Sequence, residues 1–200
     1  MTSKTTGIFM HAETVGSLPH ADALLQARAA YDAKTLDYAA LRKIEDDAIR
    51  AAVAMQERVG LQVITDGELR RNLYFEFALT GLIGVQLTWQ VEQGVAYRDT
   101  QGGTAATPKP EFSITERIRH SPDSKGARDF RFLQATTRYL AKATIGGPAI
   151  IHFFGGRAAV SEDVYPKLDD YWSDLIAAYV VELQQLREAG CSFVQFECLG

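Results

Sequence analysis

The sequence predicts an α/β fold in which parallel strands are joined by helices, and two observations predict it. Short apolar runs alternate along the 200 residues with longer segments whose apolar residues recur every three or four positions, the period of one helix face. Polar residues follow directly after several of the apolar runs, as loops follow the ends of strands. Because parallel strands need long crossover connections, this order favours repeated strand–helix units.

Two such units are expected in the first 68 residues. The first has a strand over Gly7–Ser17 and a helix over Ala21–Tyr31, and a second strand is predicted at Leu61–Thr65. Between the first helix and the second strand, the spacing of apolar residues predicts a long helix over Asp37–Val59. Its inner face is expected to contain apolar residues three or four positions apart: Leu41, Ile44, Ala48, Ala52, Met55 and Val59.

Residues 80–127 break this pattern, because glycines separate short strand-like pieces at Gly84–Gln90 and Phe112–Ile118. We interpret residues 80–127 as an inserted, β-hairpin-like excursion with a mobile tip near Gln101–Pro110.

The strand–helix order then resumes. A helix is predicted over Ala127–Leu140, a strand over Lys142–Ile145 and a loop over His152–Arg157. A long helix over Leu168–Ala189 leads to a final strand at Ser192–Glu197. The inner face of that helix is expected to contain Leu168, Trp172, Leu175, Ile176, Tyr179, Leu183 and Leu186.

Both a doubly wound sheet and a barrel fit four strands in this order. Neither a G-x-G-x-x-G nor a G-x-x-x-x-G-K-[ST] loop is present, which disfavours a nucleotide-binding doubly wound sheet. A complete (β/α)8 (TIM) barrel takes about 250 residues, so four strands correspond to half of one. Residues 1–200 are therefore predicted to be the N-terminal part of a single barrel domain.

Composition and charge exclude several classes of protein. The net charge is −4 and no basic stripe is visible, so neither nucleic acid nor an anionic membrane surface is an expected partner. We find no signal-peptide pattern and no apolar run of about 20 residues that could span a bilayer, so a soluble, cytoplasmic protein is expected. The two cysteines, Cys191 and Cys198, are expected to be reduced.

Polar residues follow three of the predicted strands: Ser17 the first, Glu68 the second and His152 the third. In a barrel these points all lie on the rim at the carboxyl ends of the strands, so we expect them to surround one ligand. A carboxylate at Glu68 could bind a substrate ammonium group. Alternatively, Asp66 caps a helix and Glu68 pairs with Arg70 or Arg71 on the surface.

The other two sites are equally open on spacing alone. In Val15-Gly16-Ser17, glycine lets a ligand approach the backbone, or Ser17 caps a helix. His152 with Phe153 and Phe154 could stack on a flat ligand, or His152 could simply be packed in the interior. No Ser-His-Asp or Cys-His arrangement and no metal-ligand spacing is apparent, so neither catalytic residues nor metal ligands are predicted.

Longer motifs point to a family. Thr14–Leu18, Gly60–Arg71 and Gly190–Gln195 resemble the cobalamin-independent methionine synthase (methionine synthase II) group, which also contains epoxyalkane:coenzyme M transferase. Gly155–Arg157 and the following Val164–Pro166 resemble that group's shorter, single-barrel members. The resemblance covers most of residues 8–196 and implies a (β/α)8 barrel.

It also implies zinc-dependent transfer of an alkyl group to a thiol, with a 5-methyltetrahydrofolate-type donor and a homocysteine-type acceptor. By the resemblance, Val15, Gly16 and Ser17 would contact the amino-acid part of the thiol substrate and Glu68 its ammonium group. His152 and Phe154 would lie where an aromatic side chain lines the folate pocket. Two alternatives stay open: transfer to coenzyme M, and a non-catalytic half-barrel that binds a ligand or pairs with a second half.

The family's zinc ligands are a histidine and a nearby cysteine, then a glutamate, then a second cysteine, all in the second half of the barrel. No H-x-C sequence occurs in residues 1–200, and Cys198 does not align with a ligand. Thr14 stands where shorter members often have histidine. A half-barrel leaves sheet edges and apolar faces uncovered, so we expect a second half-barrel or a homo-oligomer as partner.

Overall fold

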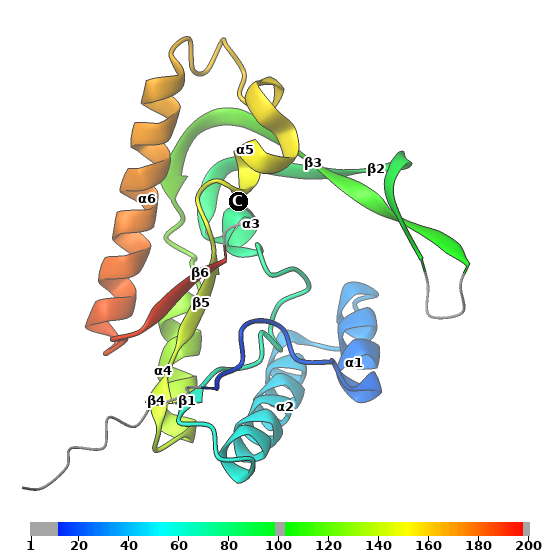
Figure 1. Ribbon diagram of the computed structural model, residues 1–200, viewed down its shortest axis with the longest axis vertical. Helices are drawn as coiled ribbons and strands as arrows, with labels where there is room; N and C mark the ends of the chain where they lie inside the picture. The colour runs from blue at the N-terminus through cyan, green and yellow to red at the C-terminus, as the bar shows by residue number, and fades with distance from the viewer. Residues whose placement is uncertain (1–11, 99–102, 198–200) are drawn as a thin grey trace, which may run out of the picture. The chain divides into compact units, whose positions relative to one another are not determined.

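The computed structural model describes residues 12–98 and 103–197, which contain helices and both parallel and antiparallel strands (Figure 1). The chain divides into two compact units, which we describe one at a time. The first comprises Met1–Arg70 and Leu133–Lys142, and the second comprises Arg71–Phe132 and Ala143–Gly200. The fold is α/β, and no closed barrel is formed within the described residues.

The first unit contains helices α1 (Asp22–Asp32) and α2 (Tyr38–Arg58), which pack against each other. Strand β1 (Val63–Ile64) pairs in parallel with β4 (Leu140–Ala141). The predicted helices and the predicted second strand are thus confirmed, although the strand is shorter than expected. No strand is formed over residues 12–17 of the predicted first strand, and its remaining residues, 7–11, lie outside the described part.

Helix α2 starts as a capped helix, because the Asp37 carboxylate accepts a hydrogen bond from the Ala40 amide at 2.7 Å. Its predicted inner face is wrong by about one residue, and Val59 is 63% exposed. The buried residues of the helix are Leu41, Glu45, Ile49, Val53 and Gln56. Two of them, Glu45 and Gln56, are polar, and an apolar pattern cannot reveal their burial.

The second unit contains a long antiparallel hairpin of β2 (Leu82–Arg98) and β3 (Thr104–His120), whose far part extends away from the helices of its unit (Figure 1). The segment interpreted as a β excursion is therefore a hairpin, with strands much longer than the predicted pieces. Residues 104–110, predicted as part of the tip, belong to β3, while 101–102 lie outside the described residues. The hairpin's register shifts after Ile83, beside Gly84.

The same unit contains the parallel pair β5 (Ala143–Gly146) and β6 (Val194–Glu197), and the long helix α6 (Leu168–Glu188) packs on β3. One predicted strand, Lys142–Ile145, is divided, because β4 pairs with β1 and β5 pairs with β6. The predicted inner face of α6 is wrong at Ile176, which is 54% exposed.

Three short elements were not predicted from the sequence: α3 (Phe77–Thr80), α5 (Ile150–Gly155) and the 3-10 helix η1 (Gly156–Ala159). Helix α4 (Gly126–Thr136) is shorter than the helix predicted there. Among the described residues, no helix combines the length and the hydropathy needed to cross a membrane.

Candidate functional site

The loop after β1 holds Glu68 in an unusual backbone conformation. Gly67 and Glu68 both have positive φ, at 66° and 58°. The turn is closed by two short-range hydrogen bonds, from the Gly67 amide to the Thr65 hydroxyl at 3.1 Å and from the Glu68 amide to the Asp66 carboxylate at 2.9 Å. Left-handed backbone at a non-glycine residue is uncommon and is enriched where function requires it. Glu68 is only 1% exposed.

Ser17 meets this carboxylate, because its hydroxyl donates a hydrogen bond to Glu68 Oε2 at 2.5 Å. The next amide, of Leu18, donates to the Gly67 carbonyl at 3.0 Å, so the loop before α1 lies along the turn after β1. Helix α1 begins after Ala21 with no side-chain cap, and Glu68 is buried rather than on the surface.

A buried amide, which the sequence analysis did not identify, joins the two loops. The side chain of Gln56 accepts from the Thr65 amide at 3.1 Å and donates to the Thr65 carbonyl at 2.9 Å. Its oxygen also accepts from the Thr14 hydroxyl at 3.2 Å. Gln56 is fully buried, so these bonds are shielded from water. The sequence contains no sign of it, because an apolar periodicity does not single out a polar residue for burial.

Charged residues support the same turn from the helix side. Arg28 donates to the Leu69 carbonyl at 2.6 Å and lies 3.6 Å from Glu45. Arg70 pairs with Asp46 at 2.7 Å and lies 3.5 Å from Glu45. The helices thereby hold both residues that follow Glu68, which limits how far its carboxylate can move.

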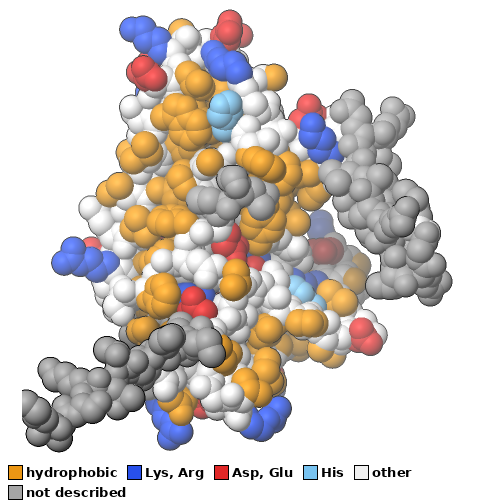
Figure 2. All heavy atoms as spheres, in the orientation of Figure 1, with side chains coloured by type: hydrophobic (Ala, Val, Ile, Leu, Met, Phe, Trp, Pro, Cys, Tyr) orange, Lys and Arg blue, Asp and Glu red, His pale blue; other side chains and the backbone are white. Residues whose placement is uncertain are grey.

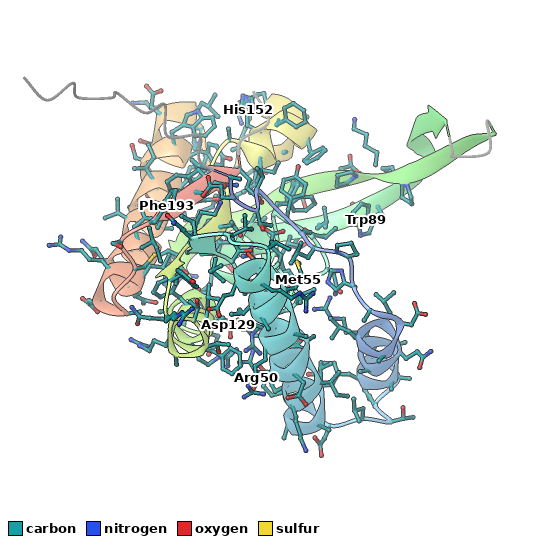
Figure 3. The ribbon with its side chains drawn as sticks, turned by 60° about the horizontal axis from the view of Figure 1, so that its bottom comes forward. Arg50, Met55, Trp89, Asp129, His152 and Phe193 are labelled. Carbon is teal, nitrogen blue, oxygen red and sulfur yellow. The ribbon has the colours of Figure 1, made fainter. Side chains whose placement is uncertain are left out.

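The predicted aromatic segment belongs to the second unit and is helical rather than a loop. His152 lies on α5 (Figure 3). Its ring lies 5.5 Å from that of Trp172 on α6, and its Nδ1 atom is buried with no hydrogen-bond partner among the described residues. Phe154 stacks on Phe112 at 6.1 Å, and both line a pocket of about 120 Å³ beside the hairpin. The ring that faces solvent is Phe153, which is 57% exposed.

The described residues do not fit a zinc site. Within residues 12–98 and 103–197, no three His, Cys, Asp or Glu side chains are grouped so that they could hold a metal ion. Cys191 is buried, its Sγ lies 3.3 Å from the Phe193 carbonyl, and burial raises the pKa of its thiol, which disfavours the thiolate that binds metals. His11 and Cys198 lie outside the described residues.

Comparison with known sequences matches residues 10–198 to the family described as cobalamin-independent synthase, catalytic domain. The protein YxjH of Bacillus subtilis is 29% identical over 187 residues, which are 93% of this chain and 47% of the relative. A 5-methyltetrahydropteroyltriglutamate–homocysteine methyltransferase of Mesorhizobium japonicum is 29% identical over 171 residues, covering 81% of this chain and 20% of the relative. The chain thus spans about half, or less, of the length of these relatives.

Solved structures agree with this assignment. A presumed vitamin-B12-independent methionine synthase from Listeria monocytogenes superposes with a TM-score of 0.72 at 27% identity, covering 94% of this chain and 51% of that one. A B12-independent methionine synthase from Shewanella has the same fold, with a TM-score of 0.58 at 18% identity over 81% of this chain and 43% of that one. The chain therefore belongs to the cobalamin-independent synthase family and corresponds to part of its catalytic domain.

Proposed function

We propose that the protein takes part in methyl transfer from a 5-methyltetrahydrofolate-type donor to the thiol of a homocysteine-type amino acid, as half of a (β/α)8 barrel. The observation that supports this most directly is the buried Glu68 carboxylate, hydrogen-bonded to the Ser17 hydroxyl at 2.5 Å. The relatives named as homocysteine methyltransferases support the same acceptor.

The chemistry of an amino-acid ligand fits this pair of loops. A carboxylate binds an ammonium group through charge-assisted hydrogen bonds, and burial strengthens them because water no longer screens the charges. In an α-amino acid the ammonium and carboxylate groups share one carbon atom. With the ammonium group on Glu68, the ligand carboxylate would lie beside Gly16 and Ser17, whose backbone amides can donate to it.

The donor side of the proposal rests on the second unit. We assign His152 and Phe154 to the flat alkyl donor, as the resemblance implies. The support is an aromatic cluster in which Phe154 stacks on Phe112 and Phe153 is exposed. Aromatic rings of this kind bind flat ligands by stacking.

Zinc enters this proposal only as an expectation from the family. Bound zinc would lower the pKa of a substrate thiol and so supply a thiolate. None of the residue groups described here supplies its ligands, so no role in zinc binding is assigned to this part of the chain. The zinc content of the purified protein, measured by mass spectrometry, tests the expectation.

Replacing the proposed ammonium ligand gives a direct test. We expect Glu68→Gln to weaken L-homocysteine binding by roughly 2–4 kcal/mol, as for one partner of a buried charge pair, in isothermal titration calorimetry. Binding of 4-mercaptobutyrate, which lacks the ammonium group, should not change. Asp47→Asn is the matched control, because Asp47 is an exposed carboxylate on α2 that pairs with Arg50 three residues away.

Unchanged homocysteine affinity in Glu68→Gln would reject the assigned role. The same series separates the alternative acceptor, because coenzyme M is a thiol sulfonate without an ammonium group and gives Glu68 nothing to bind. Comparing methyl-folate plus homocysteine with epoxide plus coenzyme M in activity assays decides between the two reactions.

A further inference from the structure

A second buried charge lies next to the proposed amino-acid site. Lys142, directly after β4, is 1% exposed, yet its Nζ donates to the Thr14 carbonyl at 2.7 Å and lies 3.3 Å from Glu13 Oε2. Its backbone amide donates to the Ile64 carbonyl at 2.9 Å, at the end of β1. Lys142 therefore joins the end of β1 to the loop that leads into Val15-Gly16-Ser17.

Burying the Lys142 charge costs free energy of folding unless other groups compensate for the lost water. Removing a lysine from water disfavours its charge, and such groups persist where an opposite charge and hydrogen bonds compensate. Here the compensation comes from Glu13 and from the Thr14 carbonyl. A charge-assisted bond to that carbonyl also polarises the peptide group that joins Thr14 to Val15.

Thr14 is held at two points. Its carbonyl accepts from Lys142, and its hydroxyl donates to Gln56, whose amide is also bonded to both backbone groups of Thr65. Lys142 and Gln56 thus each connect the loop to the end of β1, three or four residues before Glu68. The distance between Glu68 and the loop is fixed by these bonds rather than by Ser17 alone.

We propose that Lys142 is a positioning residue for the amino-acid site: it holds the Val15–Ser17 backbone where it can bind the ligand carboxylate. This inference rests on the proposed amino-acid ligand and adds a role for a residue that does not itself contact that ligand. A small displacement of a binding group has a large effect on ligand binding and catalysis, which sets the expected size of the effect.

The test removes Lys142 without leaving an unpaired buried charge. In the double variant Glu13→Gln/Lys142→Met both charges of the pair are replaced, because a lone buried carboxylate would itself destabilise the fold. Glu13→Gln/Lys142→Gln, which keeps a donor for the Thr14 carbonyl without either charge, is the second variant should the first not fold. Lys43→Met is the matched control, since Lys43 is an exposed lysine on α2.

Three probes separate positioning from general destabilisation in calorimetry. L-homocysteine carries both charged groups, 4-mercaptobutyrate only the carboxylate and 3-mercaptopropylamine only the ammonium group. We expect the double variant to bind the first two about 10- to 100-fold more weakly and the third as the wild type does. Glu68→Gln should show the opposite selectivity between the two analogues.

Two outcomes overturn the inference while leaving the proposed function in place: wild-type affinity for all three probes in a folded Lys142 variant, or equal losses for all three. If the wild-type protein binds none of the probes, the proposed amino-acid ligand fails, and this inference fails with it.

Discussion

At the scale of single residues, the sequence predicted that Ser17 and Glu68 lie together. It did not predict Gln56 and Lys142, which hold the loop that carries Ser17. Ser17 and Glu68 could be predicted because each follows a run interpreted as a strand, where barrels place functional groups. Gln56 and Lys142 could not, because an apolar periodicity gives no reason to bury a polar side chain. Their burial becomes understandable only from bonds to residues distant in sequence, such as Thr14.

Gly67 is required by both its conformation and its surroundings. Its φ is 66°, and a Cβ atom there would lie 2.8 Å from Leu18 Cδ1. We expect Gly67→Ala to lower the free energy of unfolding by about 1–2 kcal/mol from backbone strain alone, with a further loss from the contact with Leu18, in urea titration.

Gly60→Ala provides the control for the strain. Gly60 also has positive φ, at 88°, but nothing lies within 4 Å of a Cβ atom there. Gly60→Ala should therefore show the strain and not the contact. Equal losses in the two variants would contradict the expected cost of the contact and show that Leu18 moves aside freely.

At the scale of elements, the order of helices and strands was predicted well and their extents were not. The hairpin strands continue far beyond the alternating pieces because backbone pairing, such as Tyr97 with Ala105, needs no apolar alternation. The α6 face was assigned partly wrongly because Tyr171 and Glu182 are buried through specific contacts. Glu182, for example, accepts from Ser124 and pairs with His120 at 2.7 Å each.

A pH-dependent contact joins β3 to α6. The Arg117 side chain donates to Asp174 at 2.8 Å and lowers the pKa of that carboxyl. Burial acts in the opposite direction, and a hydrogen bond from the Tyr165 hydroxyl adds to the effect of Arg117. A carboxyl group with a lowered pKa in the folded state stabilises the fold above its unfolded pKa, near 3.9, and the contribution is lost as the pH falls through the folded value.

We therefore expect wild-type protein to be more stable than Asp174→Asn at pH 7, with the difference shrinking below about pH 4. The effect should be modest, because Arg117 is exposed and solvent screens the pair. Thermal unfolding followed by circular dichroism between pH 3 and pH 7 measures it. Asp163→Asn, an exposed carboxyl in the loop before α6, should leave the pH profile unchanged. A difference that stays constant with pH would contradict the assigned ion pair.

At the scale of the whole molecule, the sequence predicted parallel strand pairs, and the pairs β1–β4 and β5–β6 confirm them. Whether such pairs belong to an open sheet or a closed barrel depends on strands beyond those four, which is why spacing alone left both possible. Membership in the family favours the barrel over the open sheet. The relative YxjH is about twice as long as this chain.

Exposed apolar side chains lead to a prediction about self-association, which can be measured on a polypeptide of these 200 residues. In the second unit, α6 and β6 expose four large apolar side chains, and Figure 2 shows hydrophobic side chains gathered along the α6 side of the visible face. The four are Ile176, Val180, Val181 and Phe196, which are 54, 44, 37 and 42% exposed. Ile176 and Val180 are four residues apart and therefore lie on one face of α6. Exposed apolar groups favour association, so we expect this polypeptide to self-associate through that face.

The double variant Ile176→Glu/Val180→Lys should weaken that association and keep the helix, because glutamate and lysine four residues apart form a favourable pair and leave the net charge unchanged. Sedimentation velocity over a hundredfold concentration range is the measurement, with circular dichroism to confirm that α6 remains helical. Leu25→Glu on α1 removes an exposed apolar residue from the other unit and should leave the association unchanged. If the wild-type polypeptide sediments as a monomer at every concentration, this face does not drive association, and its apolar residues tolerate water as isolated surface residues do.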